Sequence, residues 1–166
     1  MKIVKIRGYG SSLGMRMVEP LILKEDSGVE VALIGWYFYH TDQKLNSLLN
    51  CDQFNCFELH CNIVDTCLQN YNEKFETPEE ELLAVCRPEF AKKNCMVADD
   101  SVRRGDEKKK TCVFHGYYQP SERMFIQVKH GVKKIKNISI ELRTNLGETN
   151  LFEKVNSSIY LAIKNI

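Results

Sequence analysis

The sequence predicts an all-β fold, a β-sandwich or single jelly roll of two packed antiparallel sheets, with one short helix and one long charged loop. Three observations predict this class. Apolar residues recur at every second position in several runs, which is the period of a strand. β-branched and aromatic residues concentrate in the same runs. Turn-forming residues separate the runs, and only one segment has helix signals.

The first two runs predict an early strand and a central strand. In "KIVKIRG", residues 2–8, Val4 and Ile6 share one face. In "GVEVALIGWYFYHT", residues 28–41, both faces are apolar, so we expect a strand covered on both sides, for example by a neighbouring subunit. The two faces are Val31, Leu33, Tyr37 and Tyr39, and Ala32, Ile34, Trp36 and Phe38.

The later runs alternate more cleanly. In "FNCFELHCNIV", residues 54–64, Glu58, His60 and Asn62 separate the apolar positions. The residues expected to face the core in this and the following strands are Phe57, Leu59, Cys61 and Ile63, then Met124, Ile126 and Val128, then Ile138, Ile140 and Leu142, and finally Ile159, Leu161 and Ile163.

The one helix signal lies in "TPEEELLAVCRPEF", residues 77–90. Thr77 is a candidate N-cap, and Pro78 would occupy the first helical position. The glutamates that follow suit the positive end of the helix dipole. Pro88 would end the helix after about two turns.

A polar segment, residues 92–111, reads "KKNCMVADDSVRRGDEKKKT" and is poor in large apolar residues. Such a stretch is typical of an exposed loop between two core strands. No internal repeat and no composition shift divides the chain, so we expect one domain over residues 1–166 with this loop inside it.

Composition narrows the class of protein. Apolar residues make up 43% and charged residues 27%, ordinary values for a soluble globular chain. The net charge of +1 argues against specific nucleic-acid recognition, and the basic run "RRGDEKKK" is interrupted by acids. No apolar run approaches the roughly 18 residues of a membrane helix. The N-terminus is predicted to be a strand rather than a signal peptide, so we expect a reducing compartment.

The seven cysteines cannot all pair within one chain, and free buried thiols are the default without a secretion signal. A zinc site is the alternative, because Cys51, Cys56, His60, Cys61 and Cys67 lie close in sequence and zinc takes such ligands. However, His60 and Cys61 are neighbours on a predicted strand and would point to opposite faces. We therefore expect core cysteines, no metal and no cofactor.

Motifs of catalysis are missing from the sequence. None of the four histidines lies in a zinc-protease motif, and there is no G-x-S-x-G nucleophile elbow. The stretch "YGSSLG" lacks the lysine of a phosphate-binding loop. We expect a protein that is not an enzyme, and we name no catalytic residue.

The charged loop contains Arg104, Gly105 and Asp106 in succession. An exposed arginine and aspartate on either side of a flexible glycine can bridge a receptor that offers a cation and a pocket, such as an integrin. These three residues are a candidate receptor-binding loop.

Three segments carry a resemblance to a known family. They are "GVEVALIGWYFYHT"; "FELHCNIVDTCLQN" with the later "EEELLAVCRPEF"; and the stretch from residue 114, with Tyr-x-Pro, "ISIELRT", "GE", a phenylalanine and the alternating "IYLAI". Together they resemble the minor capsid (penton) proteins of Polinton/Maverick elements and the related adintoviruses. That family has a "Cys-Asp-Ile-Val" strand, a "His-Tyr-x-Pro" turn and a closing "I.I.IRTD.G". Asn62 stands here where the family has the acid.

The resemblance implies a single jelly roll that forms a homopentamer at the vertices of an icosahedral virus-like capsid. The pentamer would contact trimers of a double-jelly-roll major capsid protein, and the protein would be found in the virion after assembly in the host nucleus or cytoplasm. In a closed ring, one flank of each protomer docks on the opposite flank of the next. Aromatic residues anchor such interfaces well. The expected interface residues are Trp36, Tyr37, Tyr39, Tyr117 and Tyr118, for each of which the alternative is burial in the core.

Two other functions stay open at this point. One is a β-sandwich binding module, domesticated or viral, that interacts with host proteins without capsid assembly; a stable monomer would favour it. The other is a small zinc-dependent protein built on the stretch from Cys51 to Cys67, which stoichiometric zinc in the purified protein would favour.

The receptor-binding loop generates one prediction. Asp106→Glu lengthens the carboxylate side chain by one methylene and should displace it from the receptor's cation. We expect the variant to lose adhesion to integrin-bearing cells in a plate assay, and unchanged adhesion would contradict the receptor role.

Overall fold

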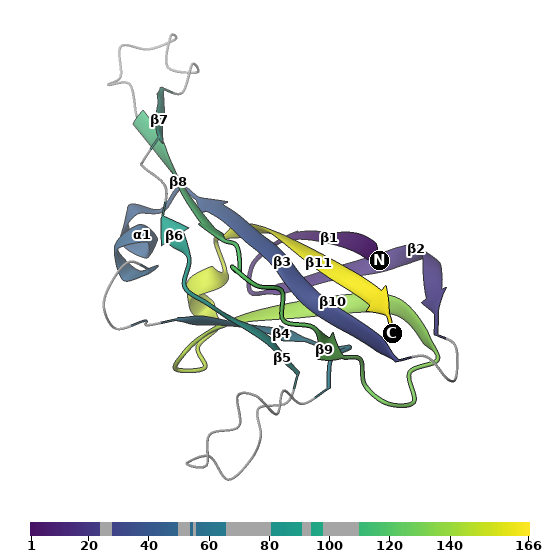
Figure 1. Ribbon diagram of the computed structural model, residues 1–166. Coiled ribbons are helices and arrows are strands. Elements are labelled where there is room, and N and C mark those ends of the chain that lie inside the picture. Colours follow the sequence, from purple (N-terminus) through teal and green to yellow (C-terminus); the bar gives the residue numbers. More distant parts are fainter. Residues whose placement is uncertain (24–27, 50–53, 55, 66–80, 91–93, 98–109) are drawn as a thin grey trace.

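Two antiparallel β-sheets face each other in the computed structural model, which describes residues 1–23, 28–49, 54, 56–65, 81–90, 94–97 and 110–166 (Figure 1). The first sheet contains, in spatial order, β1 (Lys2–Tyr9), β11 (Asn156–Asn165), β3 (Val29–His40), β8 (Lys110–Tyr118) and β6 (Glu89–Phe90). The second contains β2 (Ser12–Ile22), β10 (Lys134–Thr144), β4 (Phe57–Cys61) and β5 (Leu82–Cys86). The predicted all-β class is confirmed.

Shorter elements complete the described chain. The strands β7 (Asn94–Val97) and β9 (Ile126–Gln127) pair with β8 and β3. The remaining elements are the α-helix α1 (Gln43–Leu49) and the 3-10 helix η3 (Asn150–Phe152).

Strand alternation supplies the core between the sheets. Because successive side chains of a strand point to opposite faces, each strand presents every second residue to the facing sheet. The predicted core residues of β1, β4, β10 and β11 are buried, and each contributes about 1.5–3 kcal/mol through burial. They are Val4, Ile6, Phe57, Leu59, Cys61, Ile138, Ile140, Leu142, Ile159, Leu161 and Ile163, and Ile63 just beyond β4 is buried with them.

An aromatic cluster around Trp36 joins the two sheets. The indole is fully buried, and its ring centroid lies 4.7 Å from Phe38, 6.2 Å from Phe57 and 6.0 Å from Phe152. Its Nε1 donates a hydrogen bond to Ser157 Oγ at 3.1 Å, so the buried N–H has a partner. The cluster combines β3 of the first sheet, β4 of the second and η3.

β3 contains a β-bulge, so the predicted assignment of its residues to the two faces of the strand is wrong. The register with β11 runs from Gly35 opposite Tyr160 to Leu33 opposite Leu161, so Ile34 is skipped. One extra residue reverses which face the following side chains occupy. Tyr37 and Tyr39 are therefore exposed and do not share the face of Val31 and Leu33. The residues of β3 that face the core are Val29, Val31 and Leu33 before the bulge and Trp36, Phe38 and His40 after it.

The predicted helix near Pro88 is wrong over residues 82–86, which form β5. Cys86 lies opposite Phe57 and Ala84 opposite Leu59, and Leu82 and Cys86 are buried. Pairing with β4 and burial of apolar side chains outweigh the local capping signals, because secondary structure follows tertiary context when the two disagree. The candidate cap Thr77 and Pro78 lie outside the described residues.

The helix occurs instead directly after β3. Asp42 Oδ1 accepts hydrogen bonds from the backbone N–H groups of Lys44 at 2.9 Å and Leu45 at 3.2 Å, which is the geometry of an N-cap. The helix then buries Leu45 and Leu49 against the sandwich. Within the described ranges, no helix is long and apolar enough to cross a membrane.

Three further expectations are corrected in part. The ends of the predicted loop at residues 92–111 are strands, since Asn94–Val97 pairs with 110–113, and this ladder extends away from the sandwich (Figure 1). Cys112 is disulfide-bonded and lies opposite Cys95 in the ladder, whereas Cys61 and Cys86 are free thiols, as expected. Met124 is 54% exposed because only Ile126–Gln127 of its run pairs with β3.

One glycine generates a prediction about this packing. A Cβ on Gly116 would lie 2.0 Å from Phe38 Cζ, and that ring is held by Trp36 at 4.7 Å and Phe90 at 5.9 Å. We expect Gly116→Ala to lower the free energy of unfolding by about 2 kcal/mol or more, because the crowded ring has little room to move.

Urea unfolding monitored by tryptophan fluorescence measures the effect. The control is Gly14→Ala, where the new Cβ would only reach ordinary contact at 3.9 Å from the carbonyl oxygen of Ile138. Equal stability of the two variants would contradict the packing described here.

Candidate binding groove on the outer face of the first sheet

Tyrosines gather on the outer face of the first sheet. Side chains there alternate with buried ones, so residues two apart on each strand point outward together. Four of these tyrosines are among the exposed large side chains of the described chain: Tyr9 at 61%, Tyr37 at 44%, Tyr39 at 49% and Tyr117 at 39%. Tyr160 is half-buried between them. The face combines apolar ring surface with hydroxyl groups.

The register of the strands arranges these residues in rows across the sheet. One row runs from Tyr9 through Asn156 and Tyr39 to His115, each directly opposite the next. The next row runs from Arg7 through Ser158 and Tyr37 to Tyr117. The middle strand, β11, therefore carries small polar residues, and the strands on both sides of it carry large ones.

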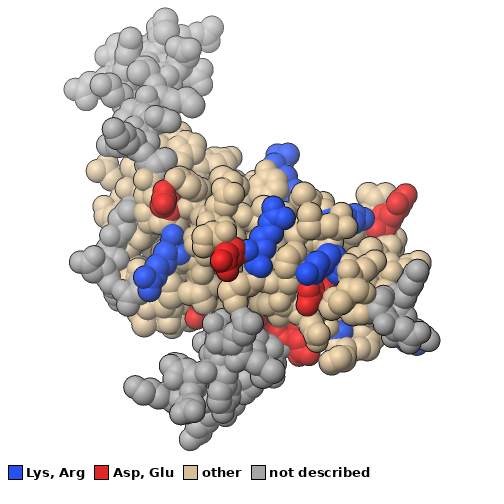
Figure 2. Space-filling model, in the orientation of Figure 1, with Lys and Arg blue, Asp and Glu red and all other residues tan. Residues whose placement is uncertain are grey.

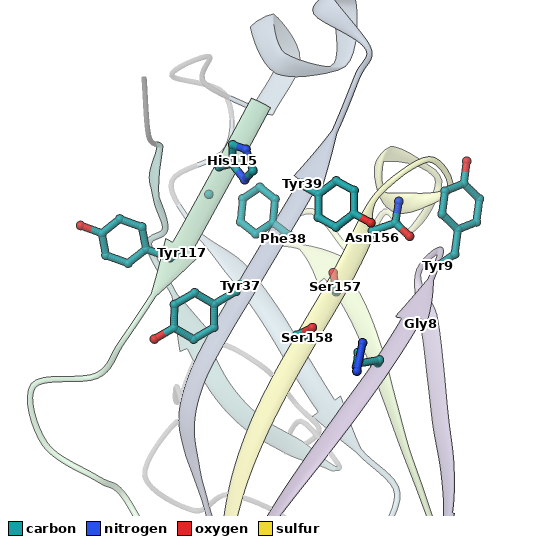
Figure 3. A pocket seen from close by; sticks show the side chains of 12 residues that line it. Gly8, Tyr9, Tyr37, Phe38, Tyr39, His115, Tyr117, Asn156, Ser157 and Ser158 are labelled. Carbon is teal, nitrogen blue, oxygen red and sulfur yellow. The ribbon is translucent and has the colours of Figure 1, made fainter. Parts of the chain in front are cut away.

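This difference in size produces a groove of about 590 Å³. Asn156 and Ser158 form its floor, and the close view shows them between Tyr9 on one side and Tyr37 and Tyr39 on the other (Figure 3). The other lining residues are Arg7, Gly8, Phe38, His115, Gly116, Tyr117 and Ser157. Among the described residues, the lining contains neither a carboxylate nor an aliphatic side chain.

Contacts among the rings hold the walls in place. Tyr37 stacks on Tyr117 with centroids 6.5 Å apart and an interplanar angle of 17°, and its edge meets Tyr160 at 5.8 Å. Tyr39 lies 6.2 Å from His115. Such aromatic pairs contribute about 0.5–1.5 kcal/mol each beyond simple burial. The rings are therefore largely oriented before any ligand binds.

The charges at the groove are basic. Arg7 lines it and forms no salt bridge with any described acidic side chain. Lys5 lies 5.0 Å from the centre of the Tyr160 ring, beside the groove. The Tyr117 hydroxyl donates a hydrogen bond to Glu89, which raises the pKa of that phenol. This hydroxyl is therefore neutral at physiological pH.

The predicted interface residues divide into two groups. Tyr37, Tyr39 and Tyr117 come together on this exposed face. Trp36 does not, because its side chain is fully buried, and its expected interface role is corrected to a core role. Tyr118 is half-buried, and it lines a different groove of about 320 Å³ beside β5.

Several groove residues were not among the sequence-based candidates: Arg7, Tyr9, His115, Asn156 and Ser158. Arg7 and Tyr9 alternate with Ile6, so the two-residue period could have placed both on the outer face. Their proximity to Tyr39 depends on β11 lying between β1 and β3, which strand alternation does not reveal.

The candidate receptor-binding residues Arg104, Gly105 and Asp106 lie outside the described residues, as do Cys51 and Cys67 of the zinc alternative. Among the described residues, no group of three or more potential ligands could hold a metal ion. His60 Nε2 lies 3.0 Å from Glu58 Oε2, on the face opposite Cys61. Burial raises the pKa of the Cys61 thiol to about 11 and also raises that of Cys86.

Acidic and basic side chains are interspersed on the face of the molecule shown in Figure 2, and neither sign forms a continuous patch there. This pattern is typical of a solvated protein surface rather than of a surface that follows a nucleic-acid backbone.

His40 is a buried imidazole at the end of β3. It is 2% exposed, its ring stacks on Phe114 at 5.3 Å, and neither ring nitrogen has a hydrogen-bond partner among the described residues. Burial lowers the pKa of His40 because the charged form loses its hydration; Asp42 opposes this shift and His115 adds to it.

In comparisons with known proteins, no protein-family model, no curated protein and no solved structure matches the chain.

The lowered pKa of His40 generates a prediction. The unfolded chain binds a proton to this residue near pH 6.5, whereas the folded chain binds it only at lower pH. Stability from a neutral His40 is therefore complete above about pH 6.5 and declines as the pH falls toward the folded-state pKa, by at most about 1.4 kcal/mol per pH unit.

Urea unfolding between pH 7.5 and 5 measures this decline. We expect His40→Phe, which keeps the ring and removes the titration, to flatten the dependence relative to the unchanged chain. The exposed His130→Gln is the control and should retain it. Identical pH profiles for His40→Phe and the unchanged chain would contradict the prediction.

Proposed function

We propose that this chain is a single jelly roll and a structural subunit of an icosahedral virus-like capsid, where it forms vertex pentamers that contact the major capsid protein. The observation that carries the proposal is the pairing scheme of the long strands. In chain order these are β1, β2, β3, β4, β5, β8, β10 and β11.

The long strands pair as one nested hairpin. The first pairs with the last, the second with the one before it, and so on inward: β1 with β11, β2 with β10, β3 with β8 and β4 with β5. Rolling such a hairpin around a core places its pairs alternately in two sheets. A jelly roll, a fold used by viral capsid and lectin domains, also has two sheets of antiparallel strands, so the pairing scheme supports the proposal.

The segment with the most specific resemblance to penton proteins forms the closing turn and strands. Thr144 ends β10, and its buried Oγ1 accepts hydrogen bonds from the backbone N–H groups of Leu146 at 3.3 Å and Glu148 at 3.1 Å. Gly147 has a φ of 80°, which favours glycine. The residues of the "RT..GE" motif are thus explained by local structure, because they form the turn that directs the chain from β10 back toward β11.

Apolar grooves on opposite flanks support assembly into a ring. On one flank, the edge strands β1 and β2 form a groove of about 400 Å³ that includes Ile3, Met15 and Val18. Val18 is 99% exposed and Ile3 60% exposed. On the opposite flank, the groove beside β5 includes Val85, and Met124 is exposed at its rim.

The two flank grooves also differ in charge. The groove of β1 and β2 contains Lys2, Lys5 and Glu19, whereas Glu122 is the charged residue among the described lining residues of the groove beside β5. Opposite charges and apolar surface on opposite flanks suit the head-to-tail contacts of a closed ring. A monomeric module that binds host proteins would not need two flank grooves that complement each other in charge.

Native mass measurement tests the proposal. We expect the purified protein to have five times the 19.2 kDa of one chain. Val18→Asp should shift the mass toward that of the monomer, because a carboxylate would be buried without a partner in the ring. The variant should still fold, with an unchanged circular dichroism spectrum, since Val18 is exposed in the single chain.

The control is Leu146→Asp, an exposed apolar residue in the turn after β10 rather than on a flank. This variant should keep the fivefold mass. A stable monomer across micromolar concentrations would contradict the ring and favour the binding module.

A further inference from the structure

We propose that the groove on the outer face of the first sheet binds a carboxylated sugar at the end of a glycan chain. This goes beyond the capsid role and does not depend on it, because the proposed ring contacts lie on the flanks.

The lining fits a sugar better than it fits another protein. Protein interfaces bury aliphatic as well as aromatic side chains, and the two flank grooves contain isoleucine, valine, leucine and methionine. The outer-face groove contains none of these and is walled by tyrosines. The face of an aromatic ring is negative, so it attracts the weakly positive C–H groups on the flat side of a pyranose.

The polar groups of the groove suit hydroxyl ligands. The amide of Asn156 and the hydroxyl of Ser158 lie at the floor, and both can donate and accept hydrogen bonds. The hydroxyl of Tyr39 stands beside Asn156 (Figure 3). A sugar ring that stacks on Tyr37 or Tyr39 would place its hydroxyls against these groups. Oriented polar groups of this kind in a mostly aromatic groove are typical of small-ligand sites.

The charge of the groove selects an acidic sugar. Arg7 has no salt bridge with a described acid, and no described carboxylate lines the groove; Glu89 accepts the hydrogen bond of the Tyr117 hydroxyl but is not part of the lining. A guanidinium binds a carboxylate through two parallel hydrogen bonds, which adds both affinity and geometric selection. A neutral sugar would leave this cation unused, whereas a sialic or uronic acid would pair with it.

The walls are ordered before binding. The stack of Tyr37 on Tyr117, the edge contact with Tyr160 and the hydrogen bond from Tyr117 to Glu89 restrict the rings. Restricted side chains lose less entropy when a ligand binds. The groove is therefore arranged to bind a small rigid ligand without closing around it.

Titrations of the whole chain with oligosaccharides, followed by backbone amide NMR shifts, test the proposal. The probes are 3′-sialyllactose and a hyaluronan tetrasaccharide, with lactose as the neutral comparison. We expect at least one acidic probe to bind about tenfold or more tightly than lactose, as expected for a charge-assisted pair. The shifts should cluster on β1, β11 and β3.

Three variants make the test specific. Arg7→Gln should lower the affinity for the acidic probe to that for lactose. Tyr39→Ala should abolish the binding of both, because a stacking ring is lost. Arg16→Gln, an exposed arginine on the edge strand β2 of the second sheet, is the matched control and should bind normally.

The native mass of each variant separates this proposal from the capsid role. If neither acidic probe binds, or if Arg7→Gln binds them as well as the unchanged chain does, the sugar site is wrong while a fivefold mass still supports the ring. If Tyr39→Ala lowers the native mass, the face is a contact between copies and the sugar site is likewise wrong.

Discussion

The extra residue in β3 between Leu33 and Gly35 decides the role of every side chain that follows it on this strand. Without it, the strict two-residue period that places Val31 and Leu33 in the core would turn Tyr37 and Tyr39 inward and Trp36 outward. The bulge at Ile34 reverses this order. Trp36 then forms the centre of the aromatic cluster between the sheets, and its N–H has Ser157 as a partner. A one-residue shift in register thus separates the part of the strand that holds the fold from the part that is available for binding.

Packing on the inner face of the first sheet also determines which side chains lie close together on its outer face, because both faces are formed by β3 and its neighbours. Phe38 needs the space above Gly116, so β8 can lie close to β3 only with glycine at this position. The same close pairing places Tyr117 beside Tyr37 on the outside. Small residues at the centre of the sheet therefore serve the core on one side and the groove on the other. The edge strands β1, β2 and β5 lie on the flanks, away from both of these surfaces.

Much of the fold follows from the sequence, because a strand with one buried face has apolar residues at every second position. The core positions of β1, β4, β10 and β11 were predictable for this reason. The bulge was not, since an uninterrupted apolar run hides a change of phase. β5 was mistaken for a helix because the capping signals before it are local, whereas pairing with Phe57 and Leu59 is not. No groove was predicted. Tyr37, Tyr39 and Tyr117 were expected at an interface, whereas Tyr9, Arg7, Asn156 and Ser158 meet them only through the order of the strands in space.

The position of β11 has a consequence for how this chain reaches its native state. β11 is the last strand in chain order, yet it lies inside the first sheet between β1 and β3. A ribosome therefore releases both neighbours well before the strand that must join them, and until then each has a bare hydrogen-bonding edge that can pair with other nascent chains. Contacts so distant along the polypeptide also slow the search for the correct pairing. Completion of the first sheet should be limited by the insertion of β11 between β1 and β3, and a chaperone that shields exposed edges would raise the yield more than one that protects helices.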